Sequence, residues 1–211
     1  MHRYKSWEHC FKYFDKEFFL AKDKNLDHAA LELGFYFASY GMYRGSSFLL
    51  WKDYRIHRDL VQKLCEYYND LYRITPEDYL DDMSKINRLF SLIKSIREYY
   101  EGFVSVIKGD GKTQKIKVTD ALSTKILLGT LCCTPAYDTF FIKGLRAKNF
   151  TYSGLKKCNF LKLLEFCKKH HVSFKNVQRE VSKDETQYPI MKIIDMYFWQ
   201  IGIEQNNEED K

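Results

Sequence analysis

The sequence predicts an all-α protein, a compact bundle of about eight to ten helices. Over most of the chain, apolar residues recur at steps of three and four, the period of an amphipathic helix. The segment Thr75–Asp78 (TPED) is a clear helix start, with a capping hydroxyl, a proline at the first helical position and acids in the first turn. Hydrophobic residues make up 45% of the 211, with 16 Tyr and 16 Phe, which is ample for an aromatic-rich core.

Four helices are expected in the first half of the chain, at residues 6–21, 27–43, 48–72 and 75–100. Aromatic residues line one face of the first helix. The second half of the second helix has no charged residue, so other helices should surround it. His57 lies among charged residues, where a surface or partly packed histidine is expected.

A glycine-rich loop near residues 102–117 suggests two lobes, a neutral one at 1–104 and a basic one at 105–203, with a single domain as the alternative. Val104, Val106, Ile116 and Val118 fit a small hairpin around the glycines of this loop. The second lobe is expected to hold helices after Thr119, from Asp138, from about 160 to 171, at 174–181 and at 189–202. Residues 204–211 (EQNNEEDK) have the composition of a disordered acidic tail.

Charge is unevenly distributed along the chain. Residues 1–104 are neutral, residues 105–188 carry a net +9 and residues 189–211 a net −3. Such a local excess attracts polyanions, so DNA or RNA is the expected partner, although lysines that merely solvate helix surfaces fit the composition equally. The cations expected to bind nucleic acid are Lys143, Arg146, Lys148, Lys156 and Lys157.

Arg44 is the only charged residue between Phe37 and Trp51. A guanidinium in apolar surroundings must find an anion or several acceptors, because an unpaired buried charge is costly. Its partner is either structural or a bound phosphate or carboxylate, which Ser46 and Ser47 would help to hold.

The stretch from Ser123 to Arg146 is the one place where residue type and spacing together suggest chemistry. An apolar helical run is broken at Pro135, and Asp138 then begins a second apolar segment. Two roles fit this carboxylate, and they are compatible. Asp followed by Thr starts an ordinary helix, and a carboxylate at the mouth of a groove can stabilise positive charge or activate water.

The segment Pro135–Thr139 (PAYDT) resembles part of the helix-hairpin-helix DNA glycosylases, in which an Asp-Thr pair follows a turn and opens a helix. The resemblance covers roughly thirty residues, and it implies that Asp138 corresponds to the essential aspartate of that family. The glycine-rich hairpin of the family has no counterpart, because residues 115–122 contain no glycine. Lys125 is too close to Asp138 to match the lysine of the lyase members.

The sequence indicates no cofactor and no metal site, because the six cysteines show neither a CxxC motif nor histidine partners at ligand spacing. No apolar run is long enough to cross a bilayer and no signal peptide is evident, so a cytoplasmic protein without a membrane partner is expected. The arginine–histidine spacing of helical ribonucleases is also missing.

These features favour a nucleic-acid-associated helical protein of glycosylase-like architecture, whose glycosylase activity has been lost with the hairpin. The alternative is a non-enzymatic binding or regulatory module with an anion or partner site around Arg44. Enzymatic activity and oligomeric state stay open at this level.

Overall fold

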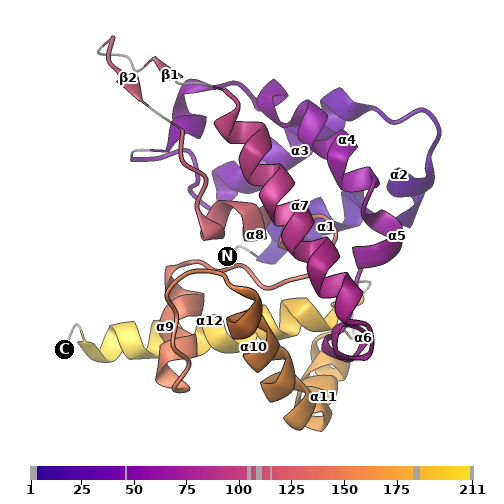
Figure 1. Ribbon diagram of the computed structural model, residues 1–211, viewed down its shortest axis with the longest axis vertical. Helices are drawn as coiled ribbons and strands as arrows, with labels where there is room; N and C mark the ends of the chain where they lie inside the picture. Colours follow the sequence, from indigo (N-terminus) through magenta and orange to yellow (C-terminus); the bar gives the residue numbers. More distant parts are fainter. Residues whose placement is uncertain are drawn as a thin grey trace.

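The computed structural model confirms the all-α fold; it describes residues 4–45, 47–103, 106–107, 111–114, 116–182 and 186–209. The only strands in this part of the chain are two residues long each (Figure 1). In chain order the elements are α1 (Tyr4–Tyr13), α2 (Lys16–Leu20), α3 (Leu26–Ser39), the 3-10 helices η1 (Phe48–Trp51) and η2 (Tyr54–His57), α4 (Arg58–Cys65), α5 (Tyr68–Leu71), α6 (Pro76–Asp81), α7 (Met83–Glu101), β1 (Val106–Ile107), β2 (Thr113–Gln114), α8 (Asp120–Gly129), α9 (Thr139–Ala147), α10 (Lys157–Lys169), α11 (His171–Val181) and α12 (Ile190–Glu209).

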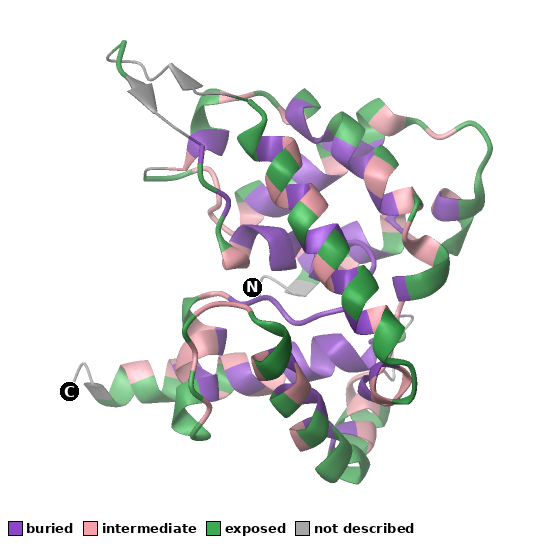
Figure 2. Cartoon of the chain, in the orientation of Figure 1, coloured by how far each residue is buried: buried purple, intermediate pink, exposed green. Residues whose placement is uncertain are grey.

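Two halves share one continuous hydrophobic core. In Figure 1 the upper half holds α1–α5, α7 and α8, and the lower half holds α6 and α9–α12. Helix α8 packs on α1, α3 and α7, whereas α6 packs on α10. The division between the halves therefore follows α8 and does not fall at residue 104, because α8 buries its apolar residues in the first half. The buried segment after α8 passes between the halves (Figure 2).

Three of the predicted long helices are each interrupted by an aspartate. Asp15, Asp53 and Asp82 have extended backbones and accept a hydrogen bond from a backbone N–H two or three residues further on. Apolar periodicity continues across each break, so the pattern alone did not show where the helices end. Within the predicted helices at 6–21, 48–72 and 75–100, these interruptions separate α1 from α2, η1 from η2 and α6 from α7. A turn at Glu66 and Tyr67 also separates α4 from α5.

The helix start at Thr75 is confirmed as a capping box: Thr75 accepts a hydrogen bond from the N–H of Asp78, and the carboxylate of Asp78 accepts one from the N–H of Thr75. The predicted hairpin is also present, with Val106 opposite Gln114 and Ile107 opposite Thr113. Ile116 and Val118 lie outside its strands as buried residues before α8, while Val104 and the turn residues 108–110 lie outside the described residues.

The predicted disordered tail is wrong for residues 204–209, because α12 continues to Glu209. Packing against α9 supports this extension: Lys143 of α9 donates a hydrogen bond to Asn206 at 2.8 Å. Within α12, Gln200 donates one to Glu204. The polar composition of residues 204–209 predicted disorder because it lacks apolar residues that would drive local folding. The contact with α9 that orders these residues is tertiary, so composition does not reveal it.

Helices α9 and α12 cross at van der Waals distance through two glycines. A Cβ atom on Gly144 would come within 1.8 Å of the carbonyl oxygen of Phe198, and one on Gly202 within 1.9 Å of that of Phe140. No side chain fits at either point, so the two backbones touch directly. This close crossing fixes α9, and therefore its first residues, on the rigid α12.

Gly144→Ala and Gly202→Ala should each destabilise the protein by on the order of 3 kcal/mol, because the added methyl group overlaps backbone atoms that do not move cheaply. Urea unfolding measures the loss. Ser91→Ala, at an exposed position of α7, is the control and should change stability by less than about 0.5 kcal/mol. Alanine variants as stable as the wild type would contradict the crossing.

His57 is fully buried, contrary to the surface or partly packed position expected from its charged sequence neighbours. Its Nε2 shares a hydrogen bond with the hydroxyl of Tyr43 at 2.9 Å, and its Nδ1 shares one with that of Tyr100 at 2.7 Å. Burial lowers the pKa of His57 from 6.5 to about 3. The imidazole is therefore a neutral link inside the first half.

Stability should fall with decreasing pH between 6.5 and 3, because the unfolded chain then binds a proton that folded His57 excludes. The stabilisation is complete above pH 6.5, and the loss is at most roughly 1.4 kcal/mol per pH unit. Urea unfolding at several pH values tests this. His57→Gln removes the contribution, and equal pH slopes for both proteins would refute it.

Candidate functional site

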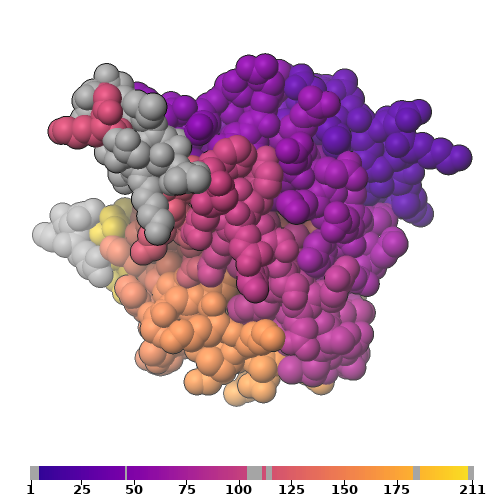
Figure 3. All heavy atoms as spheres, turned by 45° about the horizontal axis from the view of Figure 1, so that its top comes forward, coloured from indigo at the N-terminus to yellow at the C-terminus, as the bar shows by residue number. Residues whose placement is uncertain are grey.

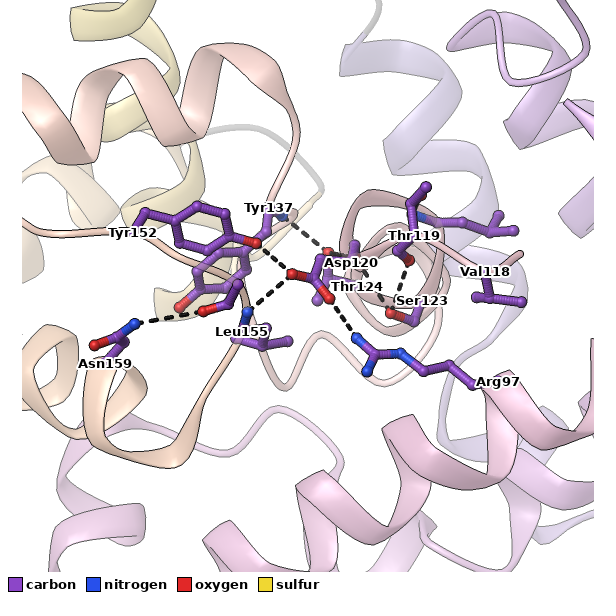
Figure 4. A network of polar contacts seen from close by, with 12 residues as sticks. Arg97, Val118, Thr119, Asp120, Ser123, Thr124, Tyr137, Tyr152, Leu155 and Asn159 are labelled. Carbon is purple, nitrogen blue, oxygen red and sulfur yellow. Dashed lines mark hydrogen bonds and ion pairs between the residues drawn. The ribbon is translucent and has the colours of Figure 1, made fainter. Parts of the chain in front are cut away.

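The candidate site is the polar side of α8, where the two halves meet; we call it the α8 seam and define it as Asp120, Thr124, Lys125 and their partners. Figure 4 shows Asp120 and Thr124 with their partners. Thr119 caps this helix by accepting a hydrogen bond from the N–H of Leu122 at 3.2 Å. All residues of α8 from Leu122 on are buried. Its polar side chains must therefore find partners inside the protein.

Asp120 joins three separate parts of the chain (Figure 4). Its carboxylate pairs with Arg97 of α7 and accepts hydrogen bonds from the Tyr152 hydroxyl and, at 2.8 Å, from the N–H of Leu155. Burial and the bond to Asp120 raise the pKa of Tyr152, so its hydroxyl stays a proton donor. The loop between α9 and α10 is thus bonded to the N-terminus of α8.

Thr124 continues the seam one turn along. Its hydroxyl donates to the carbonyl of Asp120 at 2.6 Å and accepts a hydrogen bond from the N–H of Tyr137 at 2.8 Å. The Tyr137 ring stacks on Tyr152, with centroids 5.7 Å apart. The segment before α9 and the loop after it are therefore held on the same side of α8.

Lys125 completes the seam by pairing with Asp138. Its Nζ lies 2.7 Å from Asp138 Oδ2, and the side chains are 7% and 21% exposed. The ammonium also lies over the ring of Tyr40, 4.8 Å from the centroid. The other oxygen of Asp138 accepts the N–H of Phe141 at 3.1 Å.

Asp138 thus caps α9, one of the two roles that the sequence predicted for it. Both oxygens are engaged, one by the cap and one by Lys125. Sequence analysis assigned Lys125 no role, although a single lysine beside the apolar run that follows it in α8 is a signal of a buried charge that needs a partner. The catalytic role predicted for Asp138 stays a prediction.

A second buried pair lies behind the seam. Lys192 Nζ contacts Asp195 Oδ2 at 2.8 Å, and Asp195 Oδ1 accepts the N–H of Ala136 at 3.0 Å. Burial alone would lower the pKa of Lys192, but Asp195 and Tyr40 raise it above its usual value, so the lysine is charged. Burial raises the pKa of Tyr40 to about 12. The pair pins the connection between α8 and α9 to α12.

The five predicted nucleic-acid-binding cations lie on α9 and on the loop and helix that follow it. Arg146, Lys148 and Lys156 are exposed and form no ion pair within the described part of the chain. Lys143 is partly buried beside Asn206, and Lys157 donates to Asn87 at 2.7 Å. The first three are therefore the cations with the greatest access to a ligand.

Arg44 is exposed, contrary to the apolar surroundings that its sequence neighbours suggested. Its side chain lies against Gly41, within 3.4 Å of where a Cβ would be. Because water solvates the guanidinium, no bound anion is required there. Ser47 precedes the four-residue helix η1 and makes no side-chain cap bond, while Ser46 lies outside the described residues. Nothing in these contacts favours the anion site predicted around Arg44.

No family model, curated protein or solved structure matches this chain. Within the described residues, no group of His, Cys, Asp and Glu is placed to hold a metal ion. None of the described helices is both long and apolar enough to span a membrane. Function must therefore be inferred from the geometry and charge of this chain alone.

Asp138→Asn should cost about 2 kcal/mol, because asparagine keeps the cap but leaves the buried Lys125 without its counter-charge. Lys125→Met should lower stability less, since the Asp138 carboxylate is still partly solvated and still lies at the N-terminus of α9. The double variant should be more stable than Asp138→Asn alone. Thermal and urea unfolding of the three variants measure these differences, and additive losses would contradict the pairing.

Proposed function

We propose that the protein binds nucleic acid through the surface formed by α9, α10, α11 and their connections, without base-excision chemistry. The observation that carries this proposal is the charge of residues 139–182, which contain ten Lys or Arg against two Asp or Glu. Such an excess creates a positive potential that attracts phosphate backbones.

The positions of two nearby acidic residues also favour a positive potential at this surface. Asp120 and Asp138 point into the α8 seam, where they pair with Arg97 and Lys125. They are therefore poorly placed to neutralise the surface. In Figure 3 the orange atoms of the α9–α10 loop and α10 form a broad exposed face beside α7.

The resemblance to helix-hairpin-helix glycosylases enters the proposal through one segment. Asp138 begins a helix after a turn, as the resemblance implies. The carboxylate oxygens of Asp138 are hydrogen-bonded to Lys125 and to the N–H of Phe141, and residues 116–119 before α8 form no helix. Both points support binding without base excision.

Charge reversal tests the proposal. Arg146→Glu, Lys148→Glu and Lys156→Glu together should weaken binding to DNA and RNA oligonucleotides strongly. The slope of log affinity against log salt concentration should fall by roughly one for each phosphate that the variant no longer neutralises, because fewer counterions are released. Fluorescence anisotropy at several salt concentrations measures both quantities.

The matched control reverses Lys16, Lys22 and Arg58, three exposed cations of the first half without ion pairs among the described residues. This control changes the net charge by the same amount. Because its three residues lie outside the proposed surface, it should lower the affinity far less and leave the salt slope unchanged. Equal effects of the two triple variants, or a wild type that binds neither oligonucleotide at low salt, would contradict the proposed surface.

A further inference from the structure

The loop between α9 and α10, residues 149–156, joins the parts of the proposed binding surface. Arg146 lies in the last turn of α9, just before the loop, and Lys156 at the end of the loop donates to Ser153 at 3.2 Å. Because α9 holds Arg146 in place, the position of Lys156 relative to Arg146 depends in part on the conformation of the loop.

Aromatic packing and several hydrogen bonds define that conformation. Phe150 packs its ring on Phe166 and Phe198, which fixes the start, and Asn159 donates to the carbonyl of Gly154 at 3.4 Å near the end. Between these points Asp120 accepts the bonds from Tyr152 and Leu155 (Figure 4).

The loop backbone also comes close to Asp120 at a glycine. Gly154 has a φ of +109°, and a Cβ there would lie 3.9 Å from Asp120 Oδ2. A left-handed backbone of this kind favours glycine, so the loop is shaped to bring its N–H groups and Tyr152 to the carboxylate. Asp120 thus holds the middle of the loop, together with the stacking of Tyr152 on Tyr137.

We propose that Asp120 is a positioning residue for nucleic-acid binding, which holds the α9–α10 loop in the conformation that presents Arg146 and Lys156 together. This role rests on the proposed function. A loop that is already ordered in the free protein loses little conformational entropy when the ligand binds. Affinity is therefore higher than it would be with a flexible loop.

The sign of the effect distinguishes positioning from electrostatics. Asp120→Ala removes a negative charge close to the cations, which by itself should tighten binding to phosphate. Positioning has the opposite consequence, a loss of affinity of roughly fivefold, since the loop must then be ordered on binding. Tyr152→Phe removes one bond, keeps the stacking ring and should also weaken binding.

The experiment measures dissociation constants of duplex DNA and RNA oligonucleotides by fluorescence anisotropy across salt concentrations, with amide exchange at Leu155 as a second readout. Asp120→Ala and Tyr152→Phe should weaken binding with an unchanged salt slope and speed exchange. Asp120→Asn, which keeps an acceptor, should restore part of the affinity and protection.

Two controls match the variants. Glu165→Gln removes a negative charge from an exposed position of α10 and should leave affinity unchanged or slightly higher. Asn25→Ala removes the cap of α3, where Asn25 accepts the N–H of His28 at 3.0 Å, and should lower the melting temperature without changing affinity. A loss of affinity in either control would mean that charge or stability alone explains the effect.

If the wild type binds while Asp120→Ala and Tyr152→Phe bind as well or better, the positioning role is wrong and the proposed function stands. If the wild type retains neither oligonucleotide at low salt, the proposed function is wrong and the role of Asp120 with it. If Asp120→Ala does not fold, Tyr152→Phe decides the question.

Discussion

The whole fold depends on the hydrogen bonds and ion pairs that the polar side chains of α8 form inside the protein. Asp120, Thr124 and Lys125 lie on a helix whose remaining side chains form part of the core, so each must be bonded to a group from elsewhere in the chain. The partners come from α7, from the segment before α9 and from the loop after it. Buried pairs of this kind gain little net free energy because desolvation offsets attraction. A docking of the two halves that separated Lys125 from Asp138 would leave a buried charge unpaired, which is costly.

This inward arrangement has an electrostatic consequence at the surface. The carboxylates of Asp120, Asp138 and Asp195 serve the interior contacts. The cations of α9–α11 stay outside, and long lysine side chains keep their ammonium groups in water. The carboxylates that hold the halves together therefore do not offset the positive charge of the α9–α11 surface, which connects the architecture to the proposed binding of a polyanion.

Several interior groups of types that often take part in chemistry are held protonated or are fully engaged in this structure. Burial raises the pKa of the Cys132 and Cys133 thiols and of the Tyr137 hydroxyl, so these groups are protonated and unreactive at neutral pH. Asp138 is engaged at both oxygens. These groups act through packing and hydrogen bonding, and the exposed cations are the groups with access to a partner.

Local signals in the sequence determined the all-α class, the start of α6 at Thr75 and the capping position of Asp138, because periodicity and caps act within one or two turns. Tertiary structure decided the rest of the site. Lys125 could not be paired from sequence, since which carboxylate it meets depends on the path of the buried segment between the halves. Burial of His57 and exposure of Arg44 reversed what their neighbours suggested. Solvent access is set by the packing of distant elements, which no short stretch of sequence contains.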